Sequence, residues 1–194
     1  VDAELGWGFH DLPVYPNHQL ENAREGWRQL LELFERYEIP ATWAVVGHLF
    51  LDDCEGHGEH PALPNWFECE RSALDPDLRF GGTLIDDLLE NPVDHEIACH
   101  SFSHVIFTDP RVTPEVARAE LEWATAAAER HGVEFSSFVF PRNAVAHREV
   151  LAEHGFTAYR GQPRLSFAGS TAGRLRPIRK IGAMLSRRPG LVEP

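Results

Sequence analysis

Two histidines separated by three residues, His100 and His104, stand out in the segment HEIACHSFSH at residues 95–104. The apolar residues before His100 are typical of a buried strand, so this histidine ends the strand and His104 follows about one turn later. At this spacing two imidazoles can face one point, which is a common arrangement around a first-row divalent metal ion. The spacing alone is weak evidence, because a chain with 11 histidines contains such pairs by chance.

Charged side chains follow two other predicted strands. The chain opens VDAELGWG, in which Asp2 and Glu4 lie on one side of an extended segment. The segment FSSFVF at residues 135–140 is followed by a proline and then by Arg142 and Asn143. Carboxylates, histidines and an arginine at strand ends are the components of a metal centre with a general base and an orienting cation. The combination is much stronger evidence than any one of these residues.

Each of these residues also has a simpler structural interpretation. Asp2 and Glu4 could be solvated acids at a frayed terminus, and Arg142 could be a surface ion-pair partner. Asn143 fits the N-cap of the helix that follows, and a backbone N–H near it could also face the oxyanion of an acyl-transfer reaction.

Helix-like and strand-like segments alternate along the chain. The patterns predict helices at residues 18–38, 81–92, 113–132 and 144–155, and strands at residues 41–47, 95–100, 135–140 and 156–160. This alternation predicts an α/β fold with a mostly parallel sheet, either open or closed into a barrel, and with helices outside it. In such folds the chemistry lies at the carboxyl ends of the strands, where the polar residues above are found.

The motifs resemble those of the polysaccharide deacetylases, which contain the NodB homology domain and are similar to carbohydrate esterase family 4. VDAE corresponds to the family's aspartate-containing first motif, HSFSH to its His-Ser/Thr-x-x-His second motif, and FPRN to its arginine-proline third motif. ATWAVVG is similar to the family's strand after the first helix, so the resemblance covers about residues 1–160. It implies a distorted (β/α) barrel that performs metal-dependent hydrolysis of an N-acyl amide. Because a barrel of this family normally continues past residue 194, its last strands are expected to be absent.

The resemblance also implies a role for each motif residue. Asp2 would be the general base, Glu4, His100 and His104 the ligands of a divalent metal ion, and Arg142 the residue that orients Asp2. Zn²⁺ is the expected ion, with Co²⁺, Mn²⁺ and Ni²⁺ as alternatives. Such an ion would polarise the acyl oxygen and lower the pKa of a water molecule, while the base accepts the water's proton.

The sequence departs from the family pattern in two places. The family usually has aspartate at the position of Glu4, and it supplies a general-acid histidine from a late strand, whereas the last histidine here is His154. The candidate substitutes for this acid are His10, His48 and His147.

Composition and charge limit the remaining function classes. A chain of 194 residues that is 43% hydrophobic is typical of a soluble globular protein, and it contains no apolar run long enough for a membrane span. The net charge is −12, and six of the 18 basic residues fall within residues 173–188. The strongly acidic body would repel nucleic acid. With three cysteines and no leader peptide, a cytoplasmic location is expected.

We expect one NodB-like domain at residues 1–172, with an irregular insertion at about residues 52–79, and a basic C-terminal helix or tail at residues 173–194. The insertion contains Cys54, His57, His60 and Cys69, which are zinc-type ligands, but their spacing matches no standard structural site. An insertion of this length in a compact domain could shape the substrate cleft.

Three function classes follow from these observations. The leading class is a metal-dependent hydrolase of carbon–nitrogen bonds that removes acetyl groups from an amino sugar or polysaccharide. The first alternative is an amidohydrolase that opens cyclic amides of the allantoin type. The second is a non-catalytic metal-binding domain that binds carbohydrate. The expected partner is therefore a carbohydrate or a small N-acylated substrate.

Overall fold

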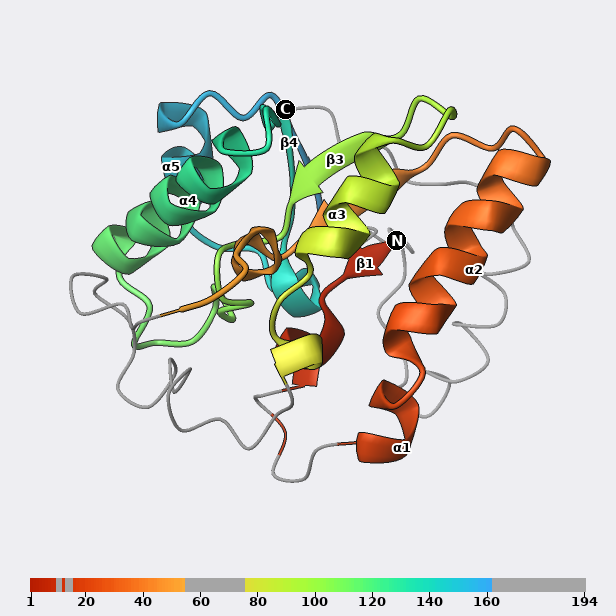
Figure 1. Cartoon of the computed structure of the whole chain (residues 1–194). Helices are drawn as coiled ribbons and strands as arrows, with labels where there is room; N and C mark the ends of the chain where they lie inside the picture. Colours follow the sequence, from red (N-terminus) through yellow and green to blue (C-terminus); the bar gives the residue numbers. More distant parts are fainter. Residues whose placement is uncertain (10–11, 13–15, 55–75, 162–194) are drawn as a thin grey trace, which may run out of the picture.

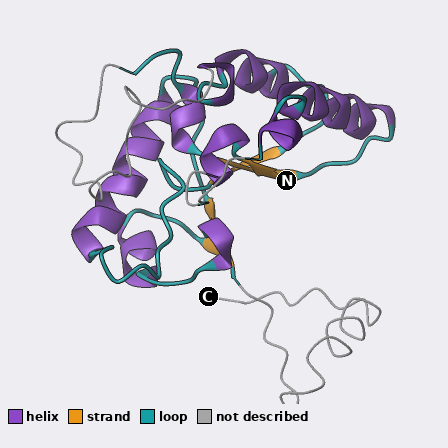
Figure 2. Ribbon diagram, turned by 90° about the horizontal axis from the view of Figure 1, so that it is seen from below, coloured by secondary structure: helices purple, strands orange, loops and turns teal. Residues whose placement is uncertain are grey.

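Five parallel strands form the centre of the protein. The computed structural model describes residues 1–9, 12, 16–54 and 76–161, and its helices lie around the strands (Figure 1; Figure 2). The strands are β1 (Asp2–Ala3), β2 (Thr42–Val45), β3 (Glu96–Cys99), β4 (Ser137–Val139) and β5 (Ala158–Arg160). Each strand pairs in parallel with the next one in the chain, so the strand order in the sheet follows the sequence.

The sheet curls into a half-barrel. The guanidinium of Arg160 in β5 forms a two-point ion pair with the carboxylate of Asp2 in β1, with Nη1–Oδ1 and Nη2–Oδ2 distances of 2.8 Å each. In a flat sheet the first and fifth strands would be roughly 19 Å apart, which is too far for this contact. In the described part of the chain, the fold is therefore an open, curled half-barrel of parallel strands with helices outside it, which agrees with the expected distorted (β/α) barrel.

The helices cover the outside of the sheet. They are α1 (Asn17–Leu20), α2 (Ala23–Arg36), α3 (Gly82–Leu89), α4 (Pro114–Glu129) and α5 (Arg148–Glu153). Short 3-10 helices follow three of the strands: η1 (Leu5–Phe9) after β1, η2 (Gly47–Phe50) after β2 and η4 (Pro141–Asn143) after β4. A fourth, η3 (Pro76–Leu78), precedes α3. Helix α2 contacts α3, and α4 contacts α5, so the helices form two groups (Figure 1). None of the helices in the described ranges is long and apolar enough to cross a membrane.

Most predicted elements are confirmed, with shorter bounds, but two helices differ. The helix predicted at residues 18–38 is divided into α1 and α2. The helix predicted from residue 144 begins at Arg148 with His147 as its N-cap, so the prediction that Asn143 caps this helix is wrong. Arg142 and Asn143 both have positive φ, at 55° and 54°, and the chain therefore turns after β4 instead of entering a helix. The basic tail and most of the insertion, including His57, His60 and Cys69, lie outside the described residues.

Gly47 lies where η2 crosses α4. A Cβ atom at this position would be 2.7 Å from Cα and 2.8 Å from Cβ of Ala124, and 3.0 Å from Cδ2 of Phe102. Since two of these atoms belong to a helix, the clash cannot be relieved by one side-chain rotation. Gly47→Ala is expected to lower the free energy of unfolding by about 2 kcal/mol, measured by urea denaturation. Gly26→Ala is the matched control, because Gly26 is exposed in α2 with no atom within 4 Å of the added carbon, and it should be neutral or stabilising. Equal stability of wild type and Gly47→Ala would contradict this close approach.

Candidate metal centre

Glu4, His100 and His104 come together at the carboxyl ends of two strands. Glu4 directly follows β1, and His100 directly follows β3, with β2 between them in the sheet. One potential ligand atom from each of the three residues lies within 4.8 Å of the other two. Oε2 of Glu4 is 2.9 Å from Nε2 of His104 and 3.4 Å from Nε2 of His100. One carboxylate oxygen and two imidazole nitrogens therefore face the same point.

The imidazole of His100 is fixed by the neighbouring strand. Its Nδ1 lies 2.6 Å from the backbone carbonyl of Val139 in β4, and both groups are buried. A carbonyl oxygen only accepts hydrogen bonds, so Nδ1 carries the proton. Nε2 of the neutral ring is then left with a lone pair that faces Glu4. A second hydrogen bond of this kind is how proteins orient metal-binding histidines.

His104 reaches the site through a tight loop. Ser101 has φ of 61° and His104 has φ of 60°, so the chain between the two histidines reverses through left-handed conformations. Burial lowers the pKa of His104, although the hydrogen bond with Glu4 opposes this effect. The side chain is 1% exposed. A buried imidazole with a lowered pKa favours the neutral form, which is the form that binds metal ions.

Glu4 is held in its ionised form. Burial raises the pKa of its carboxyl group, but the two neighbouring imidazoles, His100 and His104, outweigh this effect, and the pKa lies well below its ordinary value. The carboxylate and the two imidazoles thus provide the protonation states that a divalent ion such as Zn²⁺ requires. The three residues therefore fit a metal ion, because their donor atoms are of the types that bind one and converge on one point.

The sequence profile of the polysaccharide deacetylase family matches residues 8–159, which include His100, His104 and Arg142. The chain belongs to the polysaccharide deacetylase family. Asp2 and Glu4 precede the matched residues, so their assignment to the candidate site rests on the geometry described above.

Three solved structures are similar to this chain at low identity, and the chain spans about two thirds or less of the length of each. The Xyl-CE4 domain of a multidomain xylanase from the hindgut metagenome of Trinervitermes trinervoides is 21% identical, with 81% of this chain and 62% of that domain covered and a TM-score of 0.45. IcaB from Ammonifex degensii is 15% identical, with 81% and 66% covered and a TM-score of 0.48. BA3943, a CE4 family pseudoenzyme from Bacillus anthracis, is 11% identical, with 70% and 38% covered and a TM-score of 0.44. No match was found among curated protein sequences.

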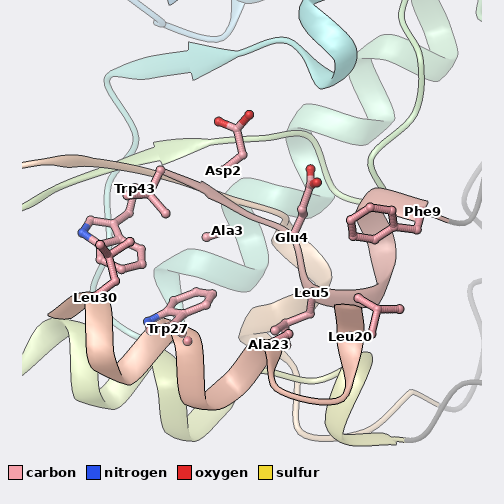
Figure 3. A pocket seen from close by; sticks show the side chains of 12 residues that line it. Asp2, Ala3, Glu4, Leu5, Phe9, Leu20, Ala23, Trp27, Leu30 and Trp43 are labelled. Carbon is pink, nitrogen blue, oxygen red and sulfur yellow. The ribbon is translucent and has the colours of Figure 1, made fainter. Parts of the chain in front are cut away.

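Asp2 projects from the same side of β1 as Glu4. Figure 3 shows both carboxylates on the side of the strand opposite to Trp27 and Ala23 of α2. A pocket of about 280 Å³ lies between β1 and α2. Asp2 and Glu4 are themselves among the residues that line this pocket, together with Ala23 and Trp27 of α2.

The arginine that contacts Asp2 differs from the expected one. The resemblance assigned this role to Arg142, whereas in the structure Arg160 pairs with Asp2 through both guanidinium Nη atoms. Burial raises the pKa of Asp2, but the hydrogen bond from Arg160 and the charge of its guanidinium outweigh this effect, and the net pKa is lowered. The curl of the sheet explains the difference, because it brings the end of β5 to β1. Sequence analysis did not single out Arg160, which lies one residue beyond the family match.

Arg142 instead supports the turn that follows Glu4. Its Nη2 donates a hydrogen bond of 2.6 Å to the backbone carbonyl of Gly8 in η1. A Cβ atom at Gly8 would lie 2.1 Å from Oε1 and 2.2 Å from Cδ of Glu4. The absence of a side chain at residue 8 therefore leaves the space in which the Glu4 carboxylate lies. The sequence signal for this space is the second glycine of LGWG, Gly8.

The candidates for a general acid are engaged elsewhere or lie outside the described residues. His48 is fully buried, its Nδ1 is 3.2 Å from the carbonyl of Arg79, and its ring stacks on Phe80. Nε2 of His147 is 3.0 Å from the carbonyl of Val112. His10 is not among the described residues.

The proposed oxyanion donor near Asn143 is also engaged. The backbone N–H of Asn143 donates to the carbonyl of Phe140 at 2.8 Å. This amide closes the turn of η4, so it is not directed at a substrate.

Proposed function

We propose that this chain is a metal-dependent hydrolase that removes the acetyl group from the nitrogen of an amino sugar unit in an oligosaccharide or polysaccharide. The observation that carries the proposal is the convergence of Glu4, His100 and His104 at one point, with their ligand atoms within 4.8 Å of one another. The membership of the polysaccharide deacetylase family supports the carbohydrate substrate. Zn²⁺ is the proposed ion, because two imidazoles and one carboxylate are a set of ligands found at catalytic zinc sites.

Three residues would bind the metal ion, and a fourth would accept a proton. Glu4 Oε2, His100 Nε2 and His104 Nε2 would hold the ion. When bound, a divalent ion at these residues would supply polarisation of the acyl carbonyl and a lowered pKa for a nearby water molecule. Asp2, which is kept ionised by Arg160, would accept a proton from that water as general base.

The proposal is tested by measuring acetate release. The chain is freed of metal, reconstituted with Zn²⁺ or Co²⁺, and incubated with oligomers of N-acetylglucosamine, with O-acetylated xylan and with allantoin. Acetate from the N-acetyl oligomers, lost in Asp2→Asn and in the metal-free chain, is the expected result. Consumption of allantoin alone would favour the cyclic amidohydrolase. Oligomer binding at saturating metal without acetate release would indicate a non-catalytic binding domain.

The pairing of Asp2 with Arg160 predicts the pH dependence of this activity. A general base must be ionised, so the rate falls as the pH drops through the pKa of Asp2. Because the hydrogen bond from Arg160 lowers this pKa, Arg160→Gln raises it, and the acid limb of kcat/KM is expected to move to higher pH. The matched control is Arg118→Gln, which removes an exposed pair with Glu153 between α4 and α5. If the acid limb of kcat/KM lies at the same pH in Arg160→Gln and in the wild type, Asp2 is not the general base.

A further inference from the structure

A buried carboxylate from α4 lies beneath the loop that joins the two histidines. Within residues 1–9, 12, 16–54 and 76–161, Glu120 is the one acidic residue buried from solvent, at 1% exposed. Its Oε2 accepts hydrogen bonds from the backbone N–H groups of Phe102 at 2.9 Å and Ser103 at 2.8 Å. Its Oε1 accepts a hydrogen bond from the hydroxyl of Ser103 at 2.5 Å. The Glu120 side chain thus accepts hydrogen bonds from three donors in the loop at residues 101–103, which joins His100 to His104.

The carbonyl groups of the same loop are held from the other side. The N–H of Gly47 donates to the carbonyl of Ser101 at 2.8 Å, and the N–H of His48 donates to the carbonyl of Phe102 at 3.0 Å. These two donors belong to η2, which packs against α4. The loop is therefore fixed between a backbone turn and a carboxylate.

The conformation of the loop requires such support. Left-handed φ values at non-glycine residues cost about 1 kcal/mol or more each, and they persist only where the surroundings enforce them. Ser101 and His104 both have such values, and these two residues mark the start and end of the turn. The loop joins the two histidines. If its backbone relaxed, Nε2 of His104 would therefore move relative to Nε2 of His100.

Glu120 is costly to bury and has no part in the proton transfer described above. Burial raises its pKa, and the hydrogen bonds from Ser103 and Phe102 oppose this effect. Oε2 can accept both amide hydrogens in either protonation state of the carboxyl group, provided that any proton is on Oε1. The two backbone hydrogen bonds to Oε2 therefore do not depend on its titration.

We propose that Glu120 is a positioning residue of the metal centre, which holds the loop at residues 101–103 so that His100 and His104 can bind one ion. This inference rests on the proposed metal-binding function. Glu120 lies about 16 positions after the HSFSH motif, in α4, and this helix contributes none of the three candidate ligands. Since outer partners of metal ligands typically change metal affinity by about 10- to 100-fold, an effect of that size is expected.

The experiment is a titration of the metal-free chain with Co²⁺, followed by visible absorption. The variants are Glu120→Ala, which removes the acceptor, and Glu120→Gln, which keeps one acceptor oxygen at the same distance. The matched control is Glu129→Ala on the exposed face of the same helix. We expect Glu120→Ala to raise the Kd for Co²⁺ at least about tenfold and to change the absorption bands, while Glu120→Gln restores the Kd to within about threefold of wild type. Glu129→Ala should match wild type.

Thermal unfolding of the metal-free variants separates positioning from a general loss of fold. A folded Glu120→Ala chain with the wild-type Kd and spectrum would overturn the inference. If Glu120→Ala does not fold, Glu120→Asp takes its place, because it keeps the charge but withdraws the carboxylate by one methylene from the loop. An unchanged Kd in Glu120→Asp would likewise overturn the inference, and a raised Kd would support it. Failure of the wild-type chain to bind Co²⁺ would overturn the proposed function and, with it, this role.

Discussion

Replacement of His104 by alanine is expected to abolish stoichiometric binding of Zn²⁺ or Co²⁺ and, with it, acetate release. The variant removes one of three ligand atoms that lie within 4.8 Å of one another, and it leaves Glu4 and His100 with an incomplete set. We expect the Kd for Co²⁺ to rise at least about 100-fold, which corresponds to about 2.8 kcal/mol of binding free energy. Metal content of the purified chain and a Co²⁺ titration measure this effect.

The control for this prediction is His154→Ala. His154 lies at the end of α5, where its Nδ1 is 2.8 Å from the carbonyl of Val150 and its Nε2 is 3.5 Å from Glu122. It is remote from the strand ends that carry the ligands, so its replacement should leave the metal content unchanged. Equal metal content in the wild type, His104→Ala and His154→Ala would show that the HSFSH segment is not a metal site.

The second large effect is expected from Gly8→Ala, a residue that donates no ligand. The added Cβ would be 2.1 Å from Oε1, 2.2 Å from Cδ and 2.6 Å from Cγ of Glu4. The three nearest atoms all belong to one side chain, so the clash is relieved when that side chain leaves its position. We expect the Kd for Co²⁺ to rise at least about tenfold, since displacement of Glu4 removes one ligand.

Gly8→Ala is distinguished from a folding defect by comparing it with Glu4→Gln. Both variants should weaken Co²⁺ binding, and in the double variant the two effects should not add, because they act through the same carboxylate. If the two effects add, or if Gly8→Ala binds Co²⁺ with the Kd of the wild type, the Glu4 carboxylate does not depend on the space beside Gly8. Urea denaturation of the metal-free chains shows whether the fold is retained.

The local order of the elements could be predicted from the sequence because it depends on short-range patterns. The pattern predicted a helix from residue 113, and the structure has Thr113 as the N-cap of α4, accepting from the N–H of Val116. The apolar run before His100 predicted β3. The parallel arrangement followed from helices that connect successive strands. Parallel strands place their carboxyl ends at one edge, which is why Glu4 and His100 could be expected near each other before any coordinates were known.

The partners of the site residues depend on contacts between distant segments, and the sequence did not predict them. The arginine of the third motif and Arg160 are both basic residues at strand ends, and only the curl of the sheet places Arg160 against Asp2. The N-cap assigned to Asn143 was wrong because two residues with positive φ turn the chain before α5 begins.

Motif spacing and apolar periodicity are local properties of the chain, so the order of the residues was enough to infer the family, the fold class and three candidate metal ligands. Only the tertiary structure decided what holds those residues in place: Gly8 against Glu4, Val139 against His100, and Glu120 beneath the loop that leads to His104. Each of these contacts joins segments whose separation in space is set by the packing of the whole half-barrel, and such distances have no signature in the order of the residues.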